Sequence, residues 1–381
     1  ENEDFFVSQD VYTNMETYIA NGEKAEQEWN ELFSKYEEAY PELASEYKKW
    51  HELDVTDELL NDKDFWKFEK GCATRQASGD VLNRLTSFIP NLMGGSADLA
   101  PSNKSDMKNT GYFSKEDRSG QNIHFGVREH AMAAITNAIA AHGGLKAYCA
   151  TFFVFSDYMK GAMRLSALMN LPVTYILTHD SIGVGEDGPT HQPIEQLAAL
   201  RSLPNMTVFR PADPNETAAA WFYAVTNKTT PTSLVLTRQN LPLYDIDGKV
   251  ALKGAYILKD SKNETPDVIL MASGSEVELI MGAADELAKK GIDARVVSMP
   301  SFELFEAQSA EYKESVLPNA VRNRVAVEAA SSFGWYKYVG LDGEVIALDH
   351  FGASAPASIL FKEFGFTVEN VVETALRVVN K

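Results

Sequence analysis

The sequence LPVTYILTHDSIGVGEDGPTHQP, residues 171–193, joins an apolar run to a polar loop. The run from Leu171 to Leu177 has the composition of a buried strand. The loop after it holds two histidines, three acidic residues and three glycines. Glycines let a backbone bend close to a ligand, and histidine and aspartate supply donors and acceptors that can change protonation near neutral pH. Because active sites gather in loops at strand ends, this loop is a candidate catalytic site.

The same loop contains the spacing Gly183-x-Gly185-x-x-Gly188, the bare form of the dinucleotide-binding fingerprint. That fingerprint requires a helix that opens at its last glycine and binds the pyrophosphate. Pro189 and Pro193 follow instead, so any helix should begin only near Pro193. The sequence therefore disfavours a nicotinamide-dependent dehydrogenase.

Length and composition bound the class of protein. A chain of 381 residues exceeds what one core usually holds, which predicts two or three domains. A hydrophobic content of 45% with 23% charged residues is typical of a soluble globular protein. We expect no membrane span and no signal peptide, because no apolar run is long enough and the first residues lack the required pattern. Cys72 and Cys149 make no metal-like spacing, which favours reduced thiols in a cytoplasmic protein.

The net charge of -19 argues against one class of partner. A strongly acidic protein repels a phosphate backbone, so nucleic-acid binding is not expected. The excess of acidic side chains is concentrated in residues 1–70.

The segment up to residue 65 has the period of a helix. Its large apolar side chains recur at alternating spacings of four and three, which predicts a helix buried along one stripe. Pro41 interrupts the pattern and should kink or restart the helix. Residues 1–65 are therefore expected to form a helical arm that lies on a neighbouring domain. The stripe consists of Trp29, Phe33, Tyr36, Tyr40, Leu43, Tyr47 and Trp50.

Residues 66–248 alternate short apolar runs with amphipathic stretches. This alternation predicts a parallel sheet with helices on both faces, whose ligands gather at the carboxyl ends of the strands. Asp213 should cap the helix that begins at Pro214. The expected strands are 122–125, 145–150, 173–178, 206–209 and 233–237, and the expected helices are 129–141, 155–169 and 214–226.

Residues 249–381 repeat this style and predict a second, smaller α/β domain. The fold class expected is thus α/β, with two domains built on largely parallel sheets and preceded by a helical arm. The expected strands are 268–272, 294–298, 324–328 and 345–347, and the expected helices are 275–290 and 367–380.

Two further motifs lie in the middle segment. Glu129 begins an apolar helix, where the helix dipole and partial burial act on its acidity in opposite directions. Phe152, Phe155 and Tyr158 lie three residues apart at a strand-to-helix junction, so each ring could face a flat ligand. Taken singly, a glutamate at a helix start is more often a salt-bridge partner, and such rings are more often core.

Six motifs, in family order, closely resemble those of transketolases. They occupy residues 73–78, 94–103, 126–135, 151–167, 178–193 and 237–242, and the resemblance extends to residue 381. It implies that residues 66–248 are the family's pyrimidine-binding domain and residues 249–381 its C-terminal domain. The implied activity is the thiamine-diphosphate-dependent transfer of a two-carbon ketol unit from a ketose phosphate to an aldose phosphate, in the pentose phosphate pathway.

The resemblance also implies how the cofactor is bound. Glu129 would donate a hydrogen bond to the pyrimidine nitrogen N1′ and so act in catalysis. Phe152, Phe155 and Tyr158 would sandwich the pyrimidine ring, because stacking is the usual way to hold an aromatic heterocycle.

For the sugar, the resemblance implies that His179 and His191 act in catalysis by passing protons or by hydrogen bonding to the carbonyl and hydroxyl groups. Asp187 would accept a hydrogen bond from a hydroxyl, which selects a hydroxylated substrate.

Arg75, Ser102 and Arg238 would bind the terminal phosphate of the sugar, since guanidinium geometry suits a bidentate contact. Each residue also has a plain alternative, a surface ion pair for the arginines and a cap for the serine. Asp98 stays open as a cofactor-side or interface residue.

The sequence contains no Gly-Asp-Gly, the motif with which the family's N-terminal domain binds a metal ion and the diphosphate of the cofactor. We therefore expect this domain, with its Mg²⁺ or Ca²⁺ ion, to be absent here and no metal site on this chain. Either a separate subunit supplies it or the chain is a fragment, which we favour because proteolysis concentrates in linkers. The isolated chain should then be inactive, and a homodimer is expected.

One alternative is another enzyme of the thiamine class, and a second is a protein that is not an enzyme. Dihydroxyacetone synthase and 1-deoxyxylulose-5-phosphate synthase are related thiamine enzymes, but His179 and His191 together with Arg75 and Arg238 favour a phosphosugar transketolase. The other alternative is a dimerising, effector-binding scaffold that does no chemistry alone.

Overall fold

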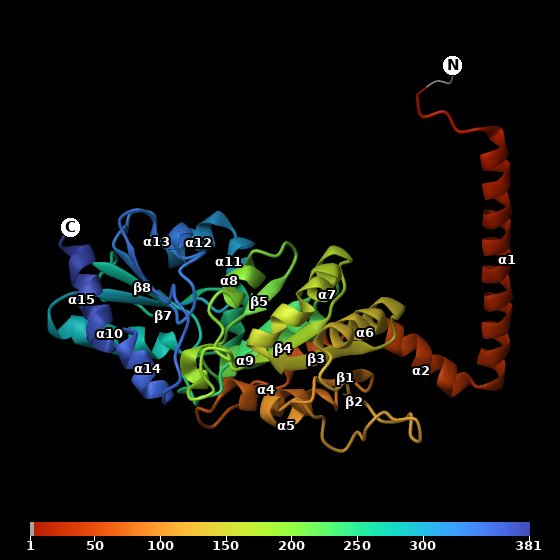
Figure 1. Cartoon of the computed structure of the whole chain (residues 1–381), viewed down its shortest axis with the longest axis horizontal. Helices are drawn as coiled ribbons and strands as arrows, with labels where there is room; N and C mark the ends of the chain where they lie inside the picture. The colour runs from red at the N-terminus through yellow and green to blue at the C-terminus, as the bar shows by residue number, and fades with distance from the viewer. Residues whose placement is uncertain (1–3) are drawn as a thin grey trace. The chain divides into compact units, whose positions relative to one another are not determined.

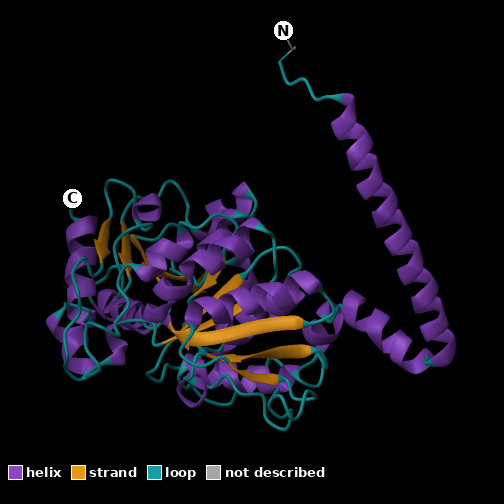
Figure 2. Ribbon diagram, turned by 45° about the vertical axis from the view of Figure 1, so that its right-hand side comes forward, coloured by secondary structure: helices purple, strands orange, loops and turns teal. Residues whose placement is uncertain are grey.

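The computed structural model describes residues 4–381, which divide into two compact units. One unit holds the described residues up to Leu53, and the other is Asp54–Lys381. The first unit holds helices α1 (Gln9–Ala39) and α2 (Pro41–Glu52). The second holds two sheets with helices interleaved between their strands (Figures 1 and 2). This is the α/β class, with two largely parallel sheets, that the sequence predicts.

The first unit restarts its helix at Pro41, as predicted. Rings of the aromatic stripe do meet, with the centroid of Phe33 5.9 Å from that of Trp29 and 5.4 Å from that of Tyr47. However, α1 has no buried residue and the side chain of Trp29 is 52% exposed. The prediction of a buried stripe is therefore wrong for this unit, because two helices offer too little apolar surface to cover each other's rings.

Six parallel strands form the first sheet, in the order β2-β1-β3-β4-β6-β5. They are β1 (Leu92–Ser96), β2 (Asn122–His124), β3 (Lys146–Phe152), β4 (Thr174–Thr178), β5 (Thr207–Phe209) and β6 (Thr232–Leu236). The central strands β3 and β4 are almost wholly buried, as expected of parallel strands covered on both faces. Because all six run in one direction, their carboxyl ends lie along one edge.

Helices cover both faces of this sheet. On one face, Met132 of α6 (Glu129–His142) joins α7 (Ser156–Leu168) and Cys149 of β3 in one buried cluster. On the other face lie α4 (Thr74–Leu85) and α9 (Pro214–Thr226). There Tyr148, the neighbour of Cys149, contacts the ring of Trp221, whose Nε1 donates to Ser78 Oγ at 2.8 Å.

The second sheet has the order β11-β10-β8-β9-β7, and only β7 pairs antiparallel. Its strands are β7 (Tyr256–Lys259), β8 (Val268–Ala272), β9 (Ala294–Ser298), β10 (Arg324–Val327) and β11 (Glu344–Ile346). Helices α10 (Glu276–Lys289) and α15 (Val368–Val379) share one apolar core with one face of the sheet. A separate core on the other face holds residues of α11 (Phe302–Glu306), α12 (Ala310–Val316) and α13 (Tyr336–Val339).

The remaining elements are short. They are the helices α3 (Thr56–Asn61), α5 (Ala100–Asn103), α8 (Gln196–Arg201) and α14 (Ala357–Glu363), and the 3-10 turns η1 (Phe153–Phe155), η2 (Ile182–Val184) and η3 (Gly248–Lys253). Because the next helix after Gly188 begins only at Gln196, the fingerprint of a dinucleotide-binding protein lacks its helix, as expected. Within residues 4–381 we find no helix with the length and apolarity needed to span a bilayer.

The strands and helices that the sequence predicts agree with the structure to within two residues at each end. Asp213 caps α9 as predicted, accepting a hydrogen bond from Glu216 N at 2.8 Å. Strand β1 was not predicted, because its glycines read as a loop. A Cβ on Gly95 would lie 1.9 Å from Ile123 O of the neighbouring strand, so the close approach of β1 and β2 requires glycine there.

Candidate active site

The residues singled out by the sequence gather at the carboxyl edge of the first sheet. Parallel strands present their following loops at this edge, so residues far apart in sequence can meet there. Asp98 and Ser102 follow β1, Glu129 follows β2, Phe152, Phe155 and Tyr158 end or follow β3, His179, Asp187 and His191 follow β4, and Arg238 follows β6. Arg75 comes instead from the first turn of α4.

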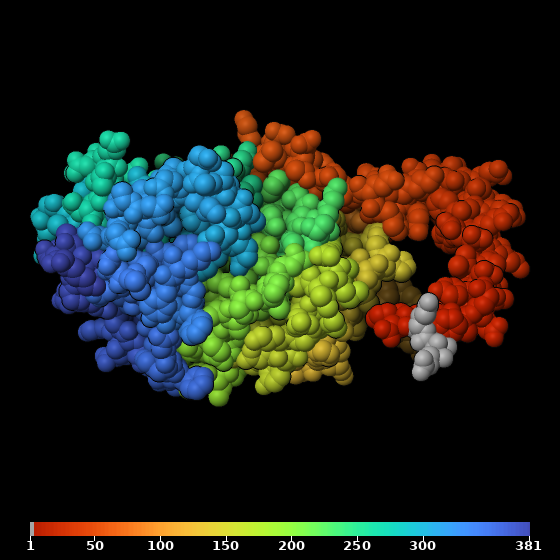
Figure 3. All heavy atoms as spheres, turned by 90° about the horizontal axis from the view of Figure 1, so that it is seen from above, coloured from red at the N-terminus to blue at the C-terminus, as the bar shows by residue number. Residues whose placement is uncertain are grey.

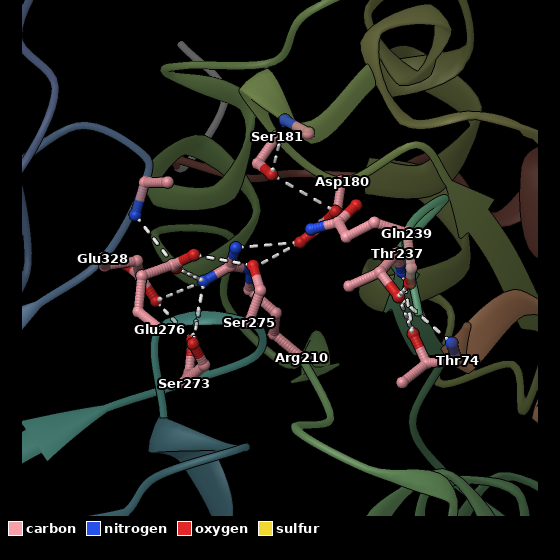
Figure 4. A network of polar contacts seen from close by, with 12 residues as sticks. Thr74, Asp180, Ser181, Arg210, Thr237, Gln239, Ser273, Ser275, Glu276 and Glu328 are labelled. Carbon is pink, nitrogen blue, oxygen red and sulfur yellow. Dashed lines mark hydrogen bonds and ion pairs between the residues drawn. The ribbon is translucent and has the colours of Figure 1, made fainter. Parts of the chain in front are cut away.

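Two buried threonines fasten α4 to the end of β6. Thr74 N donates to Thr237 Oγ1 at 3.0 Å, and Thr237 N donates to Thr74 Oγ1 at 2.7 Å (Figure 4). This reciprocal pair brings the segment that carries Arg75 to the segment that carries Arg238. The sequence analysis did not single out Thr74 and Thr237, because no local sequence pattern indicates a hydrogen-bond partner so far away in the chain.

Arg75 and Arg238 form a basic pair. Arg75 Nη1 donates to Ser102 O at 2.9 Å and lies 3.4 Å from His179 Nε2. Burial, and then the charge of Arg238, lower the pKa of Arg75. Among residues 4–381 neither arginine forms an ion pair with a carboxylate, so the ion-pair alternative is not observed. Two cations without a counter-charge favour a bound anion such as phosphate.

His179 is held in an unusual and specific place. Its backbone has φ +64°, a left-handed conformation that costs energy in a residue other than glycine. Its Nδ1 lies 2.8 Å from Thr178 Oγ1, which in turn donates to Asn103 Oδ1 at 2.6 Å. Burial, and then the charges of Arg75 and Arg238, lower the pKa of His179 to about 3. The imidazole is therefore neutral near pH 7 and can accept or donate a hydrogen bond.

The three rings form a ladder that runs from the interior to the surface. Phe152 is buried between the ring of His179, 3.7 Å away between centroids, and the ring of Phe155, 5.9 Å away and tilted by only 10°. Phe155 is half-buried and lies 6.0 Å from Tyr158, which is 66% exposed. Open aromatic faces are therefore offered by Phe155 and Tyr158, whereas Phe152 supports its neighbours.

His191 joins this ladder from the end of the glycine-rich loop. Its ring lies edge-on to Phe155 at 5.4 Å, and its Nδ1 lies 2.9 Å from Thr190 Oγ1. Asp187, in the same loop, is exposed. The loop thus brings two imidazoles into contact with one aromatic ladder, His179 at Phe152 and His191 at Phe155, and it also carries the exposed carboxylate of Asp187.

Glu129 opens α6 and is partly exposed. It forms no ion pair with any of residues 4–381, so the salt-bridged helix start is not observed. Asp98, with φ +63°, lines a hollow of about 300 Å³ together with His124 and Gly126, just before this helix. These carboxylates stand at the same edge as the aromatic ladder and are free to bind a ligand.

One cluster next to the site was not anticipated. Arg210, which follows β5, is fully buried. It pairs with Asp180, the residue after His179, and with two carboxylates beside the second sheet, Glu276 and Glu328 (Figure 4). The only sequence signal for this cluster was that Arg210 follows a short apolar strand. An arginine in that position is usually a surface residue, so the signal did not indicate a buried cluster.

Within the part of the chain that the structure describes, no group of three or more histidine, cysteine or acidic side chains has a geometry that could hold a metal ion.

Three family models match successive parts of the chain. They are described as "Transketolase, thiamine diphosphate binding domain" for residues 1–54, "Transketolase, pyrimidine binding domain" for residues 70–243 and "Transketolase-like TK C-terminal domain" for residues 254–367. The chain belongs to the transketolase family. The match of residues 1–54 corrects one expectation, because the domain expected to be absent is represented in the first helices of this chain.

Similar proteins agree with this membership. The transketolase of Bacillus subtilis is 55% identical over 388 residues, which cover 100% of this chain and 58% of that protein. The transketolase of Geobacillus stearothermophilus is 49% identical, with coverage of 100% and 58%. The chain thus spans less than two thirds of the length of the relatives it matches.

Solved structures show the same fold. Transketolase from Leishmania mexicana is 41% identical with a TM-score of 0.90, covering 100% of this chain and 56% of that one. A transketolase from Pichia stipitis in complex with sedoheptulose-7-phosphate is 44% identical with a TM-score of 0.88, with coverage of 99% and 56%. A split-gene transketolase, described as an inactive β4 tetramer, shares the fold at 24% identity and a TM-score of 0.66, with coverage of 81% and 99%.

Proposed function

We propose that this chain, which carries the pyrimidine-binding and C-terminal domains after a short stretch that matches the diphosphate-binding domain, is part of a transketolase that transfers a two-carbon ketol unit between sugar phosphates of the pentose phosphate pathway. The observation that carries the proposal is the aromatic ladder of Phe152, Phe155 and Tyr158, flanked by His179 and His191 at one edge of the sheet. The proposed domains are residues 66–248 and 249–381, after an arm of residues 1–65. The two sheets support this division.

Thiamine diphosphate would supply the carbon nucleophile that accepts the ketol unit. Phe155 and Tyr158 fit the pyrimidine ring, since both offer an open aromatic face and Phe152 supports Phe155 from behind. Glu129, without an ion-pair partner among residues 4–381, is available to share a proton with ring nitrogen N1′. An open aromatic face and an unpaired carboxylate at the same edge of the sheet support a pyrimidine site there.

The sugar would lie between the two imidazoles. His179 is neutral near pH 7, so it can accept a proton from a hydroxyl or donate to an oxygen without carrying charge. His191 lies edge-on to Phe155 in the same ladder of rings, and Asp187 in its loop can accept a hydroxyl hydrogen bond.

The terminal phosphate of the sugar would be bound by Arg75 and Arg238. Ser102 contributes its carbonyl to hold Arg75 in place and presents its hydroxyl at the same turn. Because the two arginines are close enough for each charge to act on the other, a dianion between them relieves their repulsion.

We propose two partners for the chain besides sugar phosphates. The diphosphate and its Mg²⁺ or Ca²⁺ ion need groups beyond the described residues, which a further diphosphate-binding region or subunit would supply, and without them this chain would be inactive. The exposed apolar side chains Val127 and Ile135 near and on α6, with Leu165 and Leu168 on α7, support a homodimer.

Isothermal calorimetry tests the cofactor site. The chain is mixed with a separately produced diphosphate-binding domain and Mg²⁺ and then titrated with thiamine diphosphate. Replacing one stacking ring, as in Tyr158→Ala, should weaken binding about 5- to 100-fold, since stacking on an aromatic side chain contributes about 1–3 kcal/mol per base. Tyr336→Ala is the matched control, because Tyr336 is exposed to a similar extent on α13 of the other sheet.

Equal affinities for both variants would contradict the placement of the pyrimidine. No measurable binding by the unaltered mixture, with stable self-association, would favour the scaffold or another thiamine enzyme fragment such as that of dihydroxyacetone synthase.

A further inference from the structure

The loop that carries His179 is connected to the C-terminal domain through Arg210, which follows β5 and contacts both. Arg210 Nε and Nη2 donate to Asp180 Oδ2 at 3.0 and 2.8 Å, which fixes the residue next to His179. On its other side, Arg210 Nη1 donates to Ser273 O at 2.9 Å and to the carboxylate of Glu276. Figure 4 shows Arg210 between these two sets of partners.

The anchor on the C-terminal side is itself rigid. Glu276 Oε2 accepts a hydrogen bond from Ala329 N at 2.9 Å. Glu328 lies 3.8 Å from Arg210 Nη1, and it also accepts from Arg201 Nη1 at 2.7 Å and from Trp335 Nε1 at 2.8 Å. A network of this kind has one well-defined arrangement, because breaking any member leaves a buried charge without a partner.

A second contact joins the same loop to the C-terminal domain. Gln192 Nε2 donates to Gly185 O at 2.8 Å and to Ala353 O at 2.9 Å, and Ser354 Oγ donates to Glu186 O. The space-filling view shows the two domains in close contact, with the blue C-terminal residues packed against the green middle of the chain (Figure 3). The loop is therefore held at both ends from the same domain.

We propose that Arg210 is a positioning residue, through which the C-terminal domain holds Asp180 and thereby keeps the His179 imidazole against Phe152. The left-handed backbone of His179 needs such support, since a non-glycine residue leaves that conformation when its surroundings permit. Thr178 holds the imidazole from the preceding residue and Asp180 holds the backbone from the following one. The C-terminal domain thus acts on the site without touching the substrate.

The benefit to ketol transfer rests on the proposed function, whereas the placement of His179 does not. The test therefore observes the imidazole itself in the chain without cofactor. Histidines labelled with ¹³C are followed by NMR against pH, and the His179 signal is assigned by its loss in His179→Gln. Two readouts result, the ring-current shift caused by Phe152 and the pKa of the imidazole.

Two substitutions separate positioning from simple electrostatics. Arg210→Gln removes the connection directly. Glu276→Gln nearly preserves shape but removes a negative charge, which by direct electrostatics would lower the pKa of His179, whereas release of the loop into water would raise it. Arg295→Gln is the matched control, because Arg295 is a buried arginine paired with Asp260 outside this network.

We expect both network variants to move the His179 ring signals toward unstacked values and to raise the pKa of His179 by at least one unit. The charged and titratable side chains that face His179 are not substituted in these variants; they are Arg75, Arg238 and His191. Arg295→Gln should leave both readouts unaltered. If Arg210→Gln does not fold cooperatively, Glu276→Gln decides. A His179 signal that keeps its stacked shift in a folded network variant, or a pKa that falls in Glu276→Gln, would overturn the proposal. A failure of ketol transfer in the reconstituted mixture would instead count against the proposed function alone.

Discussion

At the scale of single residues, the candidate site combines an imidazole whose charged form is disfavoured with two guanidiniums that have no carboxylate partner among residues 4–381. His179 is buried against Phe152 and lies beside Arg75, so its protonated form would have to exist in a dry and positive place. In the proposed function, a bound phosphate would stabilise the same arginine. Neutral histidine and unpaired arginine are thus two consequences of one arrangement.

This arrangement predicts a specific acid sensitivity. The folded pKa of His179, about 3, lies below the ordinary value of 6.5, so below pH 6.5 the unfolded chain binds a proton that the folded chain rejects. Stability should fall with decreasing pH, by up to about 1.4 kcal/mol per unit. His179→Gln should reduce this loss between pH 7 and 5 in urea denaturation, whereas the control His142→Gln, at an exposed position, should not. Equal losses in both variants would contradict the pKa assigned to His179.

The arginine pair predicts a loss confined to phosphorylated substrates. In the reconstituted enzyme, Arg238→Gln should raise KM for a sugar phosphate about 10- to 100-fold, because a hydrogen bond to a charged group contributes about 1.5–3 kcal/mol. KM for an unphosphorylated sugar should change little. Arg118→Gln, at an exposed position, serves as the control. Equal effects on both sugars would remove Arg238 from the phosphate site.

At the scale of elements, the start of α9 joins the two sheets through buried carboxylates. Asp213 caps the helix, and Glu216 in its first turn accepts hydrogen bonds from Tyr256 Oη of β7 at 2.8 Å and from Ser298 Oγ of β9. Burial, and then the neighbouring charge of Asp213, raise the pKa of Glu216. The junction is therefore most stable when Glu216 holds its proton.

A pH dependence of opposite sign follows for this junction. Since the folded pKa of Glu216 is raised, its contribution to stability is complete below the unfolded value of 4.5 and is lost as pH rises through the folded value. Glu216→Gln cannot ionise, so between pH 6 and 8 its unfolding free energy should fall less steeply than that of the unaltered chain. Parallel curves in chemical denaturation would show that Glu216 is already ionised in the fold.

The elements also show how far sequence reasoning reaches. Periodicity and caps located most of the strands and most of the longer helices. The candidate residues could be expected at one edge, because parallel strands must deliver their loops there. Strand β1 was not predicted, because two consecutive glycines, Gly94 and Gly95, are typical of a loop. Their lack of side chains allows β1 to lie close to its neighbouring strands. Arg210 was not predicted as part of the site, because Asp180 follows another strand and Glu276 and Glu328 lie by the second sheet, and such long-range pairing leaves no local pattern.

At the scale of the whole molecule, the C-terminal domain is connected to the loop that carries the two histidines. It contributes none of the predicted site residues, yet it binds the histidine loop through Arg210 and through Gln192. The chain spans about 58% of its Bacillus subtilis relative, so the groups that bind the diphosphate are expected beyond the described residues. In the proposed function, this chain therefore supplies the part of the site that binds the pyrimidine ring and the sugar.

Ketol transfer by the reconstituted enzyme, with Glu129 altered, tests that claim most directly. The chain is combined with a diphosphate-binding domain, Mg²⁺ and thiamine diphosphate, and transfer from xylulose 5-phosphate is measured. We expect activity that falls about 100-fold or more in Glu129→Ala, the usual scale of proton transfer catalysis, and is retained in the adjacent, exposed His130→Ala. Full activity in Glu129→Ala would contradict the account.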